Sequence, residues 1–171
     1  MFNNQKGVAI VEFAMVLPLL LLLTFITTEY GRAIYQYNVL TKSVRDAARY
    51  LSPQTPWLPA NSGLPANAAI ILRAKNLVVY GNPAGTGSPI VLGLTVAHVS
   101  NPIWQPIAAV AATTPPSTVN ANSVSIQIGD VAGGTLATPY TFIPLLASAF
   151  GVTFNNMTYG PIRATMRAPL G

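Results

Sequence analysis

The chain has 171 residues and a formal net charge of +5. Hydrophobic residues make up 51 % of it and charged residues 8 %, whereas about 25 % of the residues in a soluble domain are usually charged. Its 15 prolines and 13 glycines indicate many turns and argue against an all-helical body. The absence of cysteine excludes a disulfide framework, thiolate catalysis and a zinc–thiolate site.

The first part of the chain predicts a short leader followed by a membrane span. Residues 1–7 form the leader, and the positive charge of Lys6 favours a cytoplasmic position for it. Residues 8–26 are apolar at all but three positions, and as a helix rising about 1.5 Å per residue they cross a hydrocarbon core of about 30 Å. We therefore predict a transmembrane segment at 8–26.

One of the polar exceptions within this span is Glu12. A carboxylate inside a membrane costs about 2.5–3.5 kcal/mol on insertion scales, so Glu12 is a candidate functional residue. Residues 8–26 contain no Lys, Arg or His, so a partner for its charge must come from elsewhere. A simpler interpretation stays open, because the few apolar residues that precede Glu12 also allow it to lie at the cytoplasmic interface.

The helix is predicted to continue without a break through residues 27–51, which are amphipathic. Apolar or small residues recur there at spacings of three and four, which is typical of one helix face. The residues of this stripe are Tyr30, Ile34, Tyr37, Thr41, Val44, Ala48 and Leu51. On the polar side Glu29 can pair with Arg32, and Asp46 with basic neighbours one turn away.

Residues 52–171 are predicted to form an exported α+β domain. A helix is expected over Asn67–Tyr80, followed by a glycine-rich turn at 81–88. Asn101–Asn122, which is rich in proline and threonine, is expected to be a loop. Alternating apolar residues between turn signals predict strands of a small antiparallel sheet at Leu94–Val99, Ser123–Gly129, Thr138–Ile143 and Val152–Met166.

The exported part offers no catalytic constellation. The only histidine, His98, lies in an apolar stretch that is typical of a structural residue, and Asp130 is the only acid beyond Asp46. Paired carboxylates for acid–base catalysis and metal-ligand spacings are therefore missing. We expect no enzyme, no cofactor, no metal and no small-molecule substrate. The net positive charge lacks the dense patch with interleaved aromatics that nucleic-acid binding requires, so no nucleic-acid partner is expected.

The long helix also carries four short motifs that occur together in a known family. They are KGVAIVEF at 6–13, the run AMVLPLLLLL at 14–23, EYGR at 29–32 and VRDAARY at 44–50. Over roughly residues 5–51 the chain resembles the TadE-like family, minor pilins or pseudopilins of the tight-adherence (Tad/Flp) pilus in the type IV pilus superfamily.

This resemblance implies processing and docking sites. In the superfamily a membrane prepilin peptidase cuts after a glycine and leaves a glutamate at the fifth position of the mature chain. By resemblance the cut falls between Gly7 and Val8, and the glutamate is Glu12. The new amine of Val8 would then face Glu12 of a neighbouring subunit, so that the buried charge is neutralised between chains during assembly.

The resemblance thus implies a pilin-like α+β protein whose long N-terminal membrane-spanning helix packs by its second half against a small antiparallel sheet domain. It implies a single-pass inner-membrane protein with a cytoplasmic N-terminus and a periplasmic domain, or a pilus component, with a structural role in pilus assembly and adherence. Its partners would be the membrane, the prepilin peptidase, other Tad pilins and the assembly machinery. Two alternatives stay open: an unprocessed membrane-anchored adhesion or ligand-binding domain, and a secreted enzyme behind a signal peptide cut near Gly31–Ala33.

Overall fold

The protein is described from a computed structural model. The structure describes residues 4–54, 65–105, 123–129, 138–145, 148–149, 152–153 and 155–167. Its main element is α1 (Asn4–Leu51), a helix of 48 residues that runs through Pro18. The chain divides into two compact units that both include part of α1: residues 1–35 with 141–157, and residues 36–140 with 158–171.

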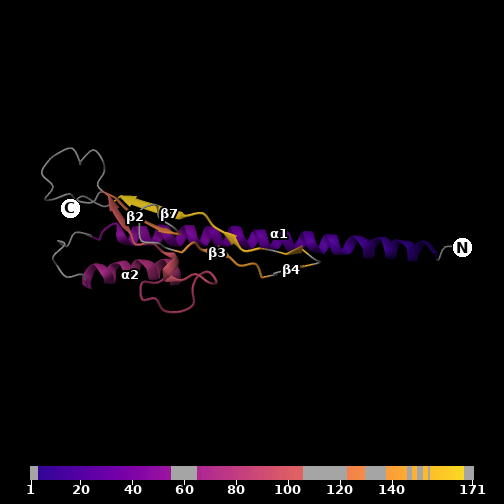
Figure 1. The fold of residues 1–171 in the computed structure, drawn as a ribbon, viewed down its shortest axis with the longest axis horizontal. Coiled ribbons are helices and arrows are strands. Elements are labelled where there is room, and N and C mark those ends of the chain that lie inside the picture. The colour runs from indigo at the N-terminus through magenta and orange to yellow at the C-terminus, as the bar shows by residue number, and fades with distance from the viewer. Residues whose placement is uncertain are drawn as a thin grey trace. The chain divides into compact units, whose positions relative to one another are not determined.

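The second unit contains the sheet and the core. Its elements besides α1 are α2 (Pro65–Tyr80), the 3-10 helix η1 (Val96–His98), β1 (Ile103–Gln105), β2 (Ser123–Ile128) and β7 (Ile162–Arg167). The strands form an antiparallel sheet in the order β1-β2-β7, with Ser123 opposite Arg167 and Ile128 opposite Ile162. Figure 1 shows α2, β2 and β7 beside the C-terminal part of α1, and these elements share one hydrophobic cluster.

The core of this unit combines both helices with the sheet. The α1 side chains in it are Leu40, Val44, Ala47, Ala48 and Leu51; those of α2 are Ala74, Val78 and Val79; those of the sheet are Val124, Ile126, Ile128, Ile162 and Ala164. Burying apolar surface of this kind contributes about 25 cal/mol per Å², so the helix is an integral part of the domain. The predicted α+β architecture, with the second half of a long helix against a small antiparallel sheet, is confirmed.

The buried face of α1 differs in part from the predicted stripe. Val44, Ala48 and Leu51 are buried as expected, but Tyr30 and Ile34 are 64 % and 47 % exposed. The core instead uses residues next to the stripe, Leu40 and Ala47 among them. A stripe drawn at alternating spacings of three and four was therefore right only for the last two turns.

One predicted strand is wrong, and the strand β1 was not predicted. Residues 94–99 are not a strand, because the backbone N–H of Thr95 donates to Nδ1 of His98 at 3.0 Å and the chain turns locally into η1. Only Val99 bridges to the sheet, at Ile128. In contrast β1 occupies the beginning of the stretch predicted as a loop, where Trp104 lies opposite Val124. The rest of that stretch, 106–122, lies outside the described residues.

The glycine-rich run 81–88 is a turn, as predicted. The side-chain amide of Asn82 donates to the carbonyl oxygen of Thr86 at 2.7 Å, and the Thr86 N–H donates to Oδ1 of Asn82 at 3.2 Å. Gly81 ends α2 with a φ of 72°, a left-handed conformation that glycine adopts without a steric cost.

The first unit consists of the N-terminal part of α1 and the segment 141–157. This segment holds β3 (Thr141–Phe142), β4 (Ser148–Ala149), β5 (Val152–Thr153) and the start of β6 (Met157–Thr158). β4 and β5 pair antiparallel, with Ala149 opposite Val152. The predicted strand 152–166 is thus divided into β5, β6 and most of β7.

Candidate functional site

The predicted site residues all lie on the first turns of α1. Val8 is 59 % exposed, and a Cβ on Gly7 would meet no other atom within 4 Å. Val8 and Glu12 are four residues apart, so the helix places them on one face, and both are exposed. Within the described part of the chain the ion pair that forms is Glu29–Arg32, and Glu12 has no such partner.

The apolar residues around Glu12 are exposed on all sides of the helix. Ile10, Met15 and Leu19 are 68 %, 78 % and 65 % exposed. The described helix Gly7–Leu51 includes a stretch long and apolar enough to cross a membrane, and none of that stretch is buried within the protein. Such a surface is stable only against lipid or against other apolar helices.

A polar cluster on α1 holds the segment 141–157 within the first unit, and we call it the Glu29–Arg32 clamp. Oε2 of Glu29 accepts from Nε of Arg32 at 3.1 Å and from its Nη2 at 2.8 Å. The same Nη2 donates to the carbonyl oxygen of Ile143 at 2.6 Å, and Oε1 of Glu29 accepts the N–H of Leu145 at 3.0 Å. The Arg32 guanidinium lies 4.3 Å from the centre of the Phe142 ring.

The sequence predicted only one part of the clamp. The Glu29–Arg32 pair is confirmed at its predicted spacing of three residues. The engagement of Ile143 and Leu145 was missed, because backbone groups more than a hundred positions away carry no sequence signal for it. The predicted pairing of Asp46 with its basic neighbours is wrong, since no described basic group lies within ion-pair distance of it.

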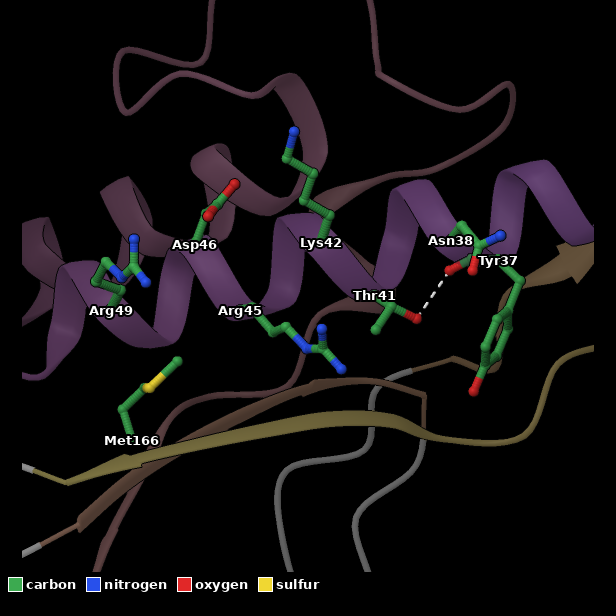
Figure 2. Close-up of a pocket in the computed structure, with 8 residues that line it drawn as sticks. All are labelled: Tyr37, Asn38, Thr41, Lys42, Arg45, Asp46, Arg49 and Met166. Carbon is green, nitrogen blue, oxygen red and sulfur yellow. Dashed lines mark hydrogen bonds between the residues drawn. The ribbon is translucent and has the colours of Figure 1, made fainter.

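The second unit contains a groove of about 470 Å³ beside α1 (Figure 2). Its lining residues are Tyr37, Asn38, Thr41, Lys42, Arg45, Asp46, Arg49 and Met166. Figure 2 shows Arg45 and Tyr37 extending from α1 toward the β7 side, and Lys42 and Asp46 extending away from it. With three basic groups and one acid, the groove carries part of the positive charge of the chain.

His98 is a structural side chain, as predicted. Besides accepting from the Thr95 backbone, its Nδ1 lies 2.8 Å from Oγ1 of Thr95, so the ring proton belongs on Nε2. The His98 and Tyr140 rings are perpendicular, with their centres 5.7 Å apart, and the Tyr140 hydroxyl donates to the Leu92 carbonyl at 2.8 Å. Among the described residues no three His, Cys, Asp or Glu side chains gather into a metal site.

Over the residues that the structure describes, these features define a class: a protein with a candidate membrane helix whose C-terminal part packs in a small α+β domain. The family model described as TadE-like protein matches residues 7–49. The resemblance of the helix to the TadE-like family is therefore confirmed, and the matched stretch includes Gly7, Val8 and Glu12. No curated protein and no solved structure matches the chain. The match lies wholly within α1 and does not reach the sheet domain.

Proposed function

We propose that this protein is a pseudopilin or minor pilin that acts structurally in assembly of the tight-adherence pilus and thereby in surface adherence. One observation carries the proposal: an exposed apolar half-helix with a single carboxylate continues directly into a half-helix buried in a folded domain. In this proposal residues 1–7 are the cytoplasmic leader, 8–26 span the inner membrane, 27–51 continue the helix, and 52–171 are the periplasmic domain.

The first step is removal of the leader by a prepilin peptidase between Gly7 and Val8. Both residues are helical, so the first turn of α1 must unwind before the bond can enter a protease cleft. Unwinding is easy here, because glycine is about 1 kcal/mol less favourable in a helix than alanine and nothing packs against Gly7.

The second step is docking through Glu12. Cleavage gives each subunit one positive amine at Val8 and one carboxylate at Glu12, on the same helix face. Pairing of the amine with the carboxylate of a neighbouring subunit neutralises both charges inside the membrane, where an unpaired charge is costly. A subunit docked out of register leaves both charges unpaired, so the pair selects the correct arrangement.

The processing step is tested by the intact mass of the protein co-expressed with its prepilin peptidase. Wild type should lose residues 1–7, and Gly7→Arg should keep them. Gly31→Arg is the matched control, since Gly31 lies on the same helix and a Cβ there would also meet no other atom within 4 Å; it should be cut normally. An uncut wild-type chain beside active peptidase would contradict the proposal and favour an unprocessed membrane anchor.

The docking step is tested by Glu12→Gln. This variant should be cut and inserted normally but should co-purify poorly with the other pilins, because the charge partner of the amine is lost. Thr24→Val is the control: it removes a polar group from the same span whose hydroxyl donates only within its own helix, to the Leu20 carbonyl at 2.8 Å. Equal pilus output from both variants would show that Glu12 is merely interfacial.

A further inference from the structure

The segment 141–157, which the clamp holds on α1, contains no charged residue. Its apolar side chains are not all turned inward: Leu145 is 71 % exposed, Ile143 46 % and Met157 45 %. An uncharged segment with large exposed apolar side chains is an unfavourable surface in water. The segment therefore needs a cover that the chain itself does not provide within the described residues.

Two polar backbone groups beside the exposed apolar side chains are satisfied internally. The clamp uses the Ile143 carbonyl and the Leu145 N–H, which are backbone groups of an exposed loop. The opposite charges of Glu29 and Arg32 cancel at 2.8 Å. Satisfied backbone groups and cancelled charges are what a loop requires in order to lie against lipid, where unpaired polar groups cost several kcal/mol.

The clamp also lies at a suitable depth. Glu29 and Arg32 follow Ile26, the last residue of the proposed span, by three and six residues, which is about 4.5 and 9 Å along the helix. The headgroup layer extends roughly 5–8 Å beyond the hydrocarbon core on each side. Tyr30, between them, is 64 % exposed, and exposed tyrosines are enriched at this level of a membrane.

An apolar hollow connects the segment with the span. A groove of about 260 Å³ lies within the first unit between Ile26 and Tyr30 of α1 and Phe142, Pro144 and Met157, and the polar residues Glu29, Thr153 and Asn155 complete its lining. Ile26 thus belongs both to the wall of this groove and to the end of the span. Along this wall the apolar surface of the membrane helix continues from Ile26 onto Phe142 and Pro144.

We propose that the segment 141–157 rests in the headgroup layer of the bilayer, with Ile143, Leu145 and Met157 against lipid and the Glu29–Arg32 clamp as its support. Continuity with the span selects lipid as the occupant rather than a soluble protein. The proposal rests on the membrane span included in the proposed function, but it does not depend on a role in the pilus.

The test uses the full chain in phosphatidylcholine vesicles. Because the sequence has no cysteine, single cysteines can each carry an environment-sensitive fluorophore. The positions are Leu145→Cys, Leu20→Cys in the middle of the span, and Leu92→Cys, a leucine of the second unit that is 65 % exposed. Each is measured with lipids that carry a quenching nitroxide either high or low on the acyl chain.

The probe at residue 145 should be quenched several-fold more than the probe at 92, and more by the high nitroxide than by the low one. The probe at residue 20 should show the reverse depth preference. If the probe at residue 145 is quenched no more than the probe at residue 92 while the probe at residue 20 is quenched, the proposed lipid contact is contradicted but the membrane span is supported. If the probe at residue 20 is not quenched either, the membrane span itself is contradicted. Blue-shifted emission at 145 without lipid quenching would assign the surface to a protein and would also overturn the proposal.

Discussion

Replacing Leu40 with alanine tests whether the second half of α1 is part of the domain core. Its side chain is fully buried, at 0 % exposure, inside the cluster formed with α2 and the sheet. Buried leucine-to-alanine changes cost about 2.7–5 kcal/mol, since the lost transfer free energy adds to the cost of the cavity. That is a large share of a typical domain stability of about 5–15 kcal/mol. We expect the melting temperature to fall by roughly 10 °C or more.

The assay is urea and thermal unfolding of the full chain in detergent, followed by circular dichroism. Leu92→Ala is the matched control, because it deletes the same atoms from a side chain that is 65 % exposed, and it should change stability by less than about 0.5 kcal/mol. The reasoning is refuted if Leu40→Ala costs no more than Leu92→Ala, because α1 would then lie on the domain without supporting its core.

Two further predictions concern α2 and the turn after it. Burial lowers the pKa of Lys75 from its usual 10.5, so the folded state binds this proton less tightly than the unfolded state. The free energy of unfolding should therefore rise with pH in the window just below 10.5. Lys75→Met should abolish that rise and shift the urea midpoint upward at pH 7. A dependence of stability on pH that is the same in the variant and in wild type would contradict this. Gly85→Ala should destabilise more than Gly87→Ala in the same assay, since both have positive φ but only at Gly85 would the new Cβ lie 2.6 Å from Nδ2 of Asn76. Equal losses would show that Asn76 moves aside.

The sequence predicted those elements that local pattern determines. The long helix and the strand at 123–128 follow from apolar periodicity, and the Glu29–Arg32 pair follows from helix spacing. The strand predicted at 94–99 was wrong because an alternation of apolar residues cannot reveal the hydrogen bond between Thr95 and His98. β1 was missed because a three-residue strand is defined by its pairing and not by a local pattern: Trp104 pairs with Val124, twenty positions away.

The candidate site likewise has a part that local sequence predicts and a part that only the fold reveals. Gly7, Val8 and Glu12 were predicted from spacing and resemblance, and their proposed roles depend on other proteins. The clamp, in contrast, joins Glu29 and Arg32 to the backbone of Ile143 and Leu145, and the fold alone brings these groups together. The exposure of the uncharged segment could not be deduced either, since a run of apolar residues predicts burial as readily as contact with lipid.

The edge of the sheet has a consequence for contacts between copies of the protein. Among the described strands β7 pairs only with β2, and its exposed positions are Arg163, Thr165 and Arg167. If two copies joined their β7 strands antiparallel about Thr165, each Arg163 would lie opposite an Arg167. Like charges placed opposite each other destabilise a strand pair, and charged edge strands resist aggregation. In a chain with so few charges, we expect these two arginines to oppose sheet pairing between copies.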